Sequence, residues 1–283
     1  MGLFGKLFDK KACDLCGGEI GLLGNRKLED GNCCKECAAK LSPWFSERRS
    51  STVESIREQL EYREANKAAV AAFHTTTTLG QNTKVLLDED AGVYMITSAR
   101  NLQEANPDVL KLSDITGCTL DVEEHSSEVR REVKDKEGHV TQESYNPKRY
   151  TYSYDFYIEL NVNNPYFSQI RFKLNNSDVD VECGGGGISR PAPGHRPAPG
   201  AGMLPGSTTP PTMAMRKNNA EYAKYEAMGE EIKAALLQVR QAARASAAAA
   251  AAPKMATKCP HCDATTTADA NGCCEYCGGA LNG

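Results

Sequence analysis

Two clusters of cysteine residues lie near the two ends of the sequence. Twelve cysteines occur among the 283 residues, five between positions 13 and 37 and five between positions 259 and 277. Each cluster contains two Cys-x-x-Cys pairs, and four thiolates are a ligand set that Zn²⁺ takes up in a closed tetrahedral site. The sequence therefore predicts two structural zinc ions, held by Cys13, Cys16, Cys34 and Cys37 and by Cys259, Cys262, Cys274 and Cys277.

The first cluster has the spacing of a treble-clef zinc module. A glycine follows its first pair, and glycine permits the positive φ that such a knuckle often needs. The second pair is expected to open a short helix over residues 34–41, because a helix N-terminus favours thiolate charge. Ser42-Pro43 would end that helix.

The second cluster predicts a zinc ribbon, in which two knuckles are joined by a short polar hairpin. His261 lies inside a complete four-cysteine set, so we interpret it as an exposed spacer. The alternative chemistry of a Cys-x-x-Cys pair is thiol redox exchange. That use needs one pair beside a βαβ unit, and neither cluster has one.

One additional cysteine precedes the second pair of each cluster. Cys33 and Cys273 stand one position too early for the two-residue spacing of a knuckle. We interpret both as small packing residues, since a free cysteine behaves as a small apolar side chain. Ligand exchange or a redox role at these positions is the alternative.

Charge and motif content weigh against two function classes. The formal net charge of −4 gives no general attraction to a phosphate backbone, so nucleic-acid binding is not expected. The sequence contains no G-x-S-x-G, no phosphate loop and no H-E-x-x-H. Because both predicted zinc sites also lack an open coordination position, we expect no enzymatic activity.

Composition divides the chain into five segments. Residues 1–72 hold the first zinc module and a helix, for which Ser51 and Glu54 fit a capping box. Further along, residues 73–182 form a β-rich domain, residues 183–217 a Gly/Pro-rich flexible linker, residues 218–252 a helix with an alanine run, and residues 253–283 the zinc ribbon.

The β-rich segment is marked by strict alternation from Tyr150 to Val162, with Tyr157 as the exception. This pattern predicts a long strand with one buried face. Shorter strands are expected on either side of "DEDAG", at 109–112, at 118–122 and at 170–174, with a solvated hairpin over 123–143. The predicted fold class is α+β, with a mainly antiparallel barrel or sandwich flanked by the zinc modules.

The helix from Asn219 carries an apolar stripe at alternating spacings of three and four residues. We expect this stripe to pack on the β domain, because Gly229 and Ala243 weaken a coiled-coil seam. Pairing with a second copy of the chain is the alternative. The stripe consists of Tyr222, Tyr225, Gly229, Ile232, Leu236, Val239 and Ala243.

The first seventy residues resemble a bacterial domain family of unknown function, through "CDLCGG", "KLEDG", "CKECAAKLSP" and "STVESIREQLEYREAN". The β segment resembles the region that commonly follows in that family, which is similar in strand content to bacterial pleckstrin-homology-like barrels. The first zinc module is also similar to the zinc-binding domain of a protein-unfolding ATPase, where it docks adaptors and substrates. This chain has no P-loop, so the resemblance implies docking alone and no catalytic residues.

The N-terminal sequence "MGLFGKLFDKK" has too short an apolar core for a signal peptide, and no run of apolar residues is long enough to span a membrane. We therefore expect a cytoplasmic location with reduced thiols. Contact of Leu3, Phe4, Leu7 and Phe8 with a membrane surface is an alternative to packing on the zinc module.

These observations favour a zinc-binding scaffold or adaptor of the bacterial cytoplasm, which would present its surfaces to protein partners. Nucleic-acid binding through the zinc modules and thiol redox sensing are the alternatives. Lysines near the clusters are sparse, with Lys35 and Lys40 beside the first and Lys254 and Lys258 beside the second. Such cover is thin for a phosphate backbone.

Overall fold

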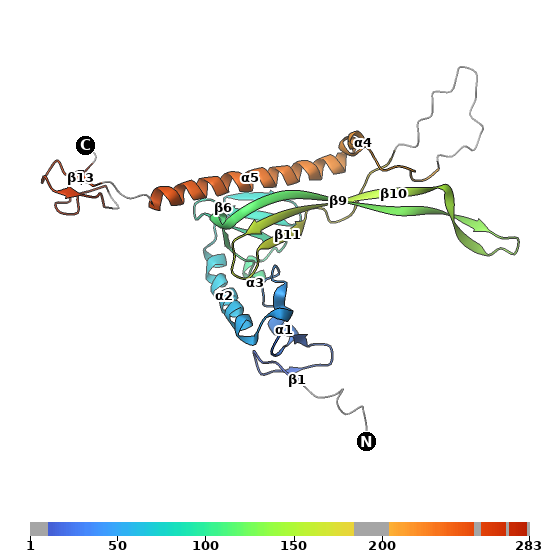
Figure 1. Ribbon diagram of the computed structural model, residues 1–283, viewed down its shortest axis with the longest axis horizontal. Coiled ribbons are helices and arrows are strands. Elements are labelled where there is room, and N and C mark those ends of the chain that lie inside the picture. Colours follow the sequence, from blue (N-terminus) through green and yellow to red (C-terminus); the bar gives the residue numbers. More distant parts are fainter. Residues whose placement is uncertain (1–10, 184–203, 252–255, 270–271, 282–283) are drawn as a thin grey trace, which may run out of the picture. The chain divides into compact units, whose positions relative to one another are not determined.

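The computed structural model describes residues 11–183, 204–251, 256–269 and 272–281 (Figure 1). The chain divides into two compact units, Met1–Arg240 and Gln241–Gly283. Secondary structure is mixed α and β, and every paired strand is antiparallel to its partner. The apolar N-terminal sequence before Lys11 and most of the Gly/Pro-rich linker lie outside the described residues.

The N-terminal module, which contains the first cysteine cluster, consists of short elements around a small core. Its elements are β1 (Lys11–Ala12), β2 (Glu19–Ile20), β3 (Arg26–Lys27), β4 (Asn32–Cys33), α1 (Lys35–Ala38) and a 3₁₀ turn, η2 (Glu47–Ser50). Strand β1 pairs with β2, and β3 pairs with β4. Helix α1 is shorter than the predicted 34–41, because Cys34 is its N-cap and the chain leaves the helix after Ala38.

Helix α2 (Val53–Ala72) begins with a capping box one residue later than predicted. Thr52 Oγ1 accepts a hydrogen bond from the Ser55 N–H at 3.2 Å, and Ser55 Oγ accepts one from the Thr52 N–H at 3.1 Å. The predicted pair of Ser51 and Glu54 was wrong, because the Ser51 hydroxyl instead donates to the carbonyl of Glu47 in the preceding 3₁₀ turn.

Buried polar contacts join α2 to the β domain. Arg63 Nη1 lies 2.6 Å from Asp108 Oδ1, and the Ser42 hydroxyl donates to the other carboxylate oxygen at 2.7 Å. The Arg63 and Asp108 side chains are 7% and 0% exposed. Asn66 accepts from the Val109 N–H and donates to the carbonyl of Pro107. The N-terminal module, α2 and the β domain are therefore held together by buried hydrogen bonds and one buried ion pair.

The first half of the β domain is a four-stranded meander in the order β5-β6-β7-β8. Its elements are β5 (Thr77–Gly80), β6 (Lys84–Asp88), β7 (Val93–Thr97), α3 (Leu102–Ala105), β8 (Leu110–Lys111) and the 3₁₀ turn η3 (Leu112–Asp114). The hairpin expected around "DEDAG" is confirmed as β6–β7, with Leu87 and Tyr94 paired and buried.

The second half is a sheet built on one long hairpin. It contains β9 (Ile115–Lys134), β10 (Val140–Val162), β11 (Gln169–Lys173) and β12 (Val179–Asp180). Beyond the predicted strand at 118–122, β9 continues into the solvated hairpin expected over 123–143, which is confirmed as the mostly exposed outer part of β9 and β10. In the part of the chain that the structure describes, the two sheets do not close into a barrel.

Helices α4 (Met213–Asn218) and α5 (Ala220–Ala251) follow the linker, and the apolar stripe of α5 covers the buried face of β9 and β10. The Tyr222 ring lies 5.1 Å from Tyr154 and 5.0 Å from Phe156, centroid to centroid. A Cβ at Gly229 would meet the Leu120 side chain, so glycine at this position allows a close approach of helix and sheet. The expected packing of this stripe on the β domain is confirmed.

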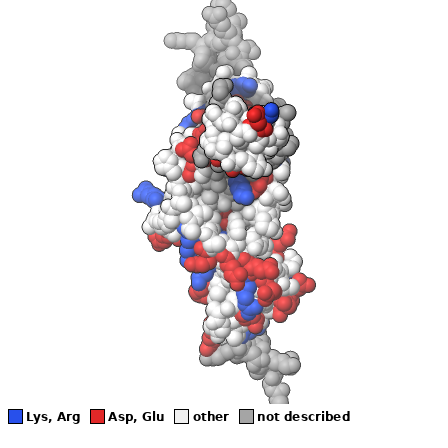
Figure 2. All heavy atoms as spheres, turned by 90° about the vertical axis from the view of Figure 1, so that its left-hand side faces the viewer, with Lys and Arg blue, Asp and Glu red and all other residues white. Residues whose placement is uncertain are grey.

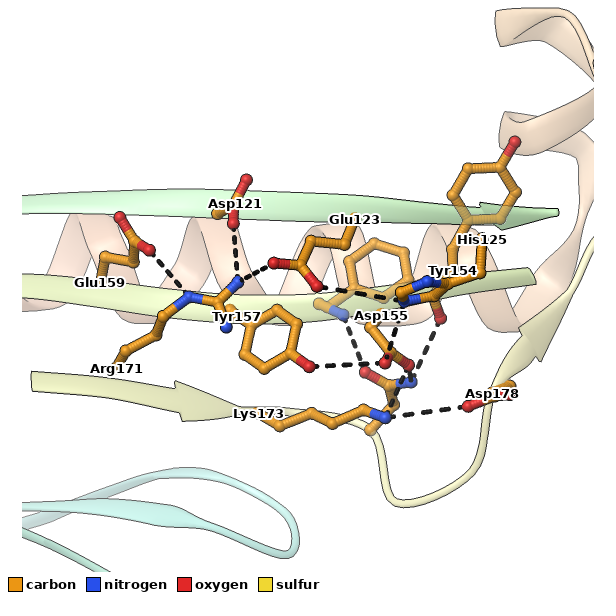
Figure 3. A network of polar contacts seen from close by, with 12 residues as sticks. Asp121, Glu123, His125, Tyr154, Asp155, Tyr157, Glu159, Arg171, Lys173 and Asp178 are labelled. Carbon is orange, nitrogen blue, oxygen red and sulfur yellow. Dashed lines mark hydrogen bonds and ion pairs between the residues drawn. The ribbon is translucent and has the colours of Figure 1, made fainter. Parts of the chain in front are cut away.

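The opposite face of this sheet carries a network of charged groups (Figure 3). The Arg171 guanidinium contacts the carboxylates of Asp121, Glu123 and Glu159 at 2.6–2.8 Å. It also stacks 3.5 Å from the centre of the Tyr157 ring. This stacking explains why an aromatic residue interrupts the polar face of β10.

Candidate metal centres

The four cysteines predicted to hold the first metal ion lie together in the structure. The Sγ atoms of Cys13, Cys16, Cys34 and Cys37 all lie within 4.8 Å of one another. Cys13 and Cys16 come from a knuckle after β1, while Cys34 caps α1 and Cys37 lies inside that helix. Three of the four residues are buried, and Cys16 is exposed. Four sulfur atoms at this separation form a complete donor set for one tetrahedral ion.

Backbone amides stabilise negative charge on these sulfur atoms. The Cys34 N–H donates to Cys13 Sγ at 3.3 Å, and the Cys37 N–H donates to Cys34 Sγ at 3.3 Å. Burial alone would raise the pKa of Cys13, but backbone hydrogen bonds from Cys34, Cys16 and Leu15 outweigh it and lower the pKa to about 6. Burial and the neighbouring sulfurs raise the pKa of Cys37. Cys13 is therefore more easily deprotonated than Cys37, and a bound cation would stabilise the thiolate form of all four cysteines.

Cys33 is not one of the four grouped sulfurs but lies beside them, in the core of the module. It is 0% exposed and packs in one cluster with Leu28, Leu41 and Ile56. Its Sγ lies 3.3 Å from the carbonyl oxygen of Cys34. This environment matches the interpretation of Cys33 as a packing residue, and it leaves the thiol without access to solvent.

The second set also brings its four sulfur atoms within 4.8 Å of one another. Cys259 Sγ lies 3.6 Å from Cys277 Sγ, and Cys262 Sγ lies 3.7 Å from Cys274 Sγ. The only paired strands described in this unit are β13 (Thr257–Lys258) and β14 (Thr265–Thr266). His261 is exposed and lies outside the group of sulfurs. The geometry is that of two knuckles facing one another across a metal position.

Three of the four Cys-x-x-Cys pairs share one backbone arrangement. In each knuckle the N–H of the first cysteine donates to the carbonyl oxygen of the residue five positions later. The carbonyl oxygen of the same cysteine accepts a hydrogen bond from the N–H of the residue four positions later. The residue at that fourth position has positive φ, with +71° at Gly17, +60° at Asp263 and +70° at Gly278. The glycine expected after the first pair therefore serves its predicted purpose, and Asp263 occupies the same conformation without being glycine.

Cys273 occupies a different environment from Cys33. It is half-buried, its N–H donates to Asp269 Oδ1 at 2.8 Å, and it forms an isolated bridge with Ala280. The backbone of Cys273 is therefore fixed by these contacts, and its side chain is less enclosed than that of Cys33.

A third group of ligand-type side chains was missed by the sequence analysis. Asp135, Glu137 and His139 lie together at the turn between β9 and β10, and all three are exposed. The Asp135 carboxylate accepts hydrogen bonds from the backbone N–H groups of Glu137 and His139. These hydrogen bonds close the turn, which explains why the three side chains lie together. Exposed acidic groups of this kind are common without a metal ion.

Comparison with known proteins identifies only the N-terminal part of the chain. Residues 11–59 match a family described as a domain of unknown function (DUF4428). The matched range contains both Cys-x-x-Cys pairs of the first module and the start of α2. No curated protein and no solved structure matches the chain.

The described helices also bear on membrane association. None of them is both long and apolar enough to cross a membrane.

Proposed function

We propose that this chain is a zinc-binding scaffold or adaptor of the bacterial cytoplasm, which presents its surfaces to protein partners and catalyses no reaction. The observation that carries the proposal is the pair of complete four-cysteine groups. With four protein sulfurs around each position, no coordination site is left for a substrate or an activated water. The ions would cross-link short loops that have few other contacts.

Zinc is the ion that best fits both donor sets. Tetrahedral groups of four thiolates suit Zn²⁺, and knuckles of this spacing are typical of structural zinc sites. Cys13, Cys16, Cys34 and Cys37 would hold one ion, and Cys259, Cys262, Cys274 and Cys277 the other. Iron is the main competitor for four thiolates, and the absorption spectrum of the purified protein separates the two.

A pleckstrin-homology-like arrangement of the β domain is part of the proposal. A meander of four strands, β5 to β8, is followed by a meander of three, β9 to β11, and then by α5 packed on the second sheet. This order of elements supports the likeness, although the strands form an open pair of sheets. Such a domain serves as a platform for binding partners, and the fold alone does not name them.

The two alternatives have less support. On the face shown in Figure 2, the basic side chains of the described residues are scattered among acidic ones and form no continuous stripe. A nucleic-acid-binding surface would need such a stripe. A redox sensor would need an accessible reactive thiol, whereas Cys33 is fully enclosed in its module and Cys273 is half-buried.

The adaptor role is tested by capture from native cells with the full chain as bait. Cys34→Ser and Cys274→Ser baits serve as matched controls, because each removes one metal ligand from one module. A protein that is enriched by the wild-type chain and lost with one of these variants supports a zinc-module adaptor. If all three baits enrich the same proteins, the modules do not present the binding surface and the proposal fails.

A further inference from the structure

Two leucines at the tip of a turn in the first zinc module have almost no contact with the rest of the protein. Leu22 is 81% exposed and Leu23 is 87% exposed. They are the only adjacent pair among the exposed large apolar side chains of the described residues. Single exposed apolar residues are ordinary, whereas two side by side at a protruding tip suggest an external partner.

The turn itself does not require leucine. It is closed by a hydrogen bond from the Gly24 N–H to the Gly21 carbonyl at 2.9 Å, which places both leucines at its central positions. Glycine, asparagine, aspartate, proline and serine are the residues that stabilise such positions. The local structure therefore gains nothing from these two apolar side chains.

Basic side chains lie directly behind the tip, on the strands that carry it. Lys11 of β1 pairs with Ile20, two residues before Leu22, and Arg26 and Lys27 form β3 after the turn. The Arg26 guanidinium donates to the Leu23 carbonyl at 3.1 Å, which fixes it at the base of the turn. Lys11 is therefore paired with the strand that leads into the turn, and Arg26 and Lys27 begin the strand that leads out of it.

We propose that the Gly21–Gly24 turn is an insertion loop for an anionic lipid surface. Leu22 and Leu23 enter the boundary between headgroups and acyl chains, while Lys11, Arg26 and Lys27 contact lipid phosphates. Apolar groups of interfacial proteins enter a bilayer by about 5–10 Å, and the cations at the base of the turn would then lie near the headgroups. Each cation near an anionic leaflet adds to the attraction.

A lipid surface suits this feature better than a protein partner for two reasons. The feature is a convex tip with charge behind it, so the apolar and basic groups meet the two layers of a membrane interface in the correct order. In addition, the sequence joined to Lys11 contains Leu3, Phe4, Leu7 and Phe8 with Lys6 and Lys10. An apolar and basic sequence beside the turn would add to peripheral binding, as a second membrane-binding signal does in other proteins.

This inference goes beyond the proposed adaptor function and does not depend on it, since lipid binding requires only a folded first module. The test is co-sedimentation of the zinc-loaded full chain with vesicles of phosphatidylcholine, or of phosphatidylcholine and phosphatidylglycerol in equal amounts. We expect binding to the mixed vesicles that falls as salt is raised. The variant with Leu22→Ser and Leu23→Ser should bind at least about ten-fold more weakly, because each leucine loses its apolar burial.

Matched variants separate the insertion loop from general effects. Val140→Ser with Met213→Ser changes two other exposed apolar residues and should leave vesicle binding unchanged. Lys11→Glu with Lys27→Glu should weaken binding to the anionic vesicles by about ten-fold or more, because two attractions become repulsions. Zinc content and circular dichroism of each variant establish that the first module is folded.

Three results would overturn the proposal. The first is a wild-type chain that binds neither kind of vesicle, and the second is a double-serine variant that binds as well as the wild type. The third is a deletion of residues 1–10 that abolishes binding while the double-serine variant retains it. Loss of a captured protein from the double-serine variant, without vesicle binding by the wild type, would instead assign the turn to a protein partner.

Discussion

The two cysteine modules share a knuckle geometry but differ in what surrounds it. In the first module the cysteines lie in a core with Leu28, Leu41 and Ile56, and α2 fixes that core to the β domain. In the described part of the second module, only Cys259, Thr266 and Cys274 are buried. A group of four cysteine sulfurs therefore lies in a packed module at one end and in an almost coreless one at the other.

This difference in packing predicts how strongly the folding of each module depends on a bound metal ion. A module with no apolar core of its own derives its folding free energy from metal binding, whereas a packed module has a second source. We therefore expect the second module to be the more sensitive to metal loss.

Removing one ligand from the second module should have the largest effect. Cys274→Ser is expected to release the metal and unfold residues 256–281, at a cost on the order of 10 kcal/mol to that module. Cys34→Ser should release the first metal but leave α2 and the β domain folded. Limited proteolysis with zinc analysis compares the two, and equal protease sensitivity of both modules would remove the contrast.

The attachment of the first module depends on Arg63. Replacing it by alanine leaves the Asp108 carboxylate buried without its ion-pair partner, so we expect a loss of about 3–5 kcal/mol in the free energy of unfolding. Lys67→Ala on the same helix breaks only an exposed pair with Glu64 and should cost less than about 1 kcal/mol. Urea denaturation measures both, and similar losses would argue against a buried joint.

The two additional cysteines offer a smaller comparison. Cys33→Ser should retain both metal ions and cost about 1–2 kcal/mol, since a polar group replaces a buried thiol that has one carbonyl acceptor. Cys273→Ser, at a half-buried position, should be nearly neutral. Zinc content and thermal unfolding measure both variants. Loss of metal from Cys33→Ser would show that the ligand register of the first module is wrong by one residue.

Asp88 fixes the exit of α2 to the β6–β7 hairpin and predicts a pH dependence. Its carboxylate accepts from the Ala91 N–H at 3.0 Å and from the His74 N–H at 2.8 Å, which lowers its pKa. A lowered folded pKa adds stability above the unfolded value of about 3.9, and that stability is lost as the pH falls through the folded pKa. Asp88→Asn should therefore cost about 1–2 kcal/mol at neutral pH. Urea midpoints across the acid range should converge for the two proteins, and a constant difference would contradict this origin.

The smallest expected effect concerns the knuckle that lacks a glycine. Asp263 has φ of +60° where the other two knuckles have Gly17 and Gly278. Asp263→Gly should stabilise the second module by about 0.5–1 kcal/mol and slow metal loss to a chelator. The exposed contact with Lys258 offsets little of this gain. Faster metal release from the variant would mean that the aspartate side chain matters more than the backbone conformation.

The parts of the molecule that sequence predicts well are governed by local spacing. Each Cys-x-x-Cys pair specifies its own turn, so the two groups of four sulfurs could be anticipated without knowledge of the fold. The alternation along β10 and the stripe on α5 likewise predicted which faces are buried. Apolar periodicity reports burial directly.

The features that sequence did not predict depend on contacts between distant residues. The pairing of Arg63 with Asp108 joins two ordinary polar residues, and neither carries a local signal. The outer half of β9 was predicted only as part of a solvated hairpin over 123–143, because polar residues on both faces give no alternation that fixes the strand ends. Leu22 and Leu23 stand between two glycines, a sequence that indicates a turn. Only the structure shows that both side chains are exposed at that turn.

The most direct test of the account is the metal content of the freshly purified full chain. Elemental analysis should find two zinc ions per chain, one in each single variant Cys34→Ser and Cys274→Ser, and none in the double variant. Fewer than one metal ion in the wild-type chain, or two ions retained in the double variant, would contradict the assignment of the two cysteine groups as structural zinc sites.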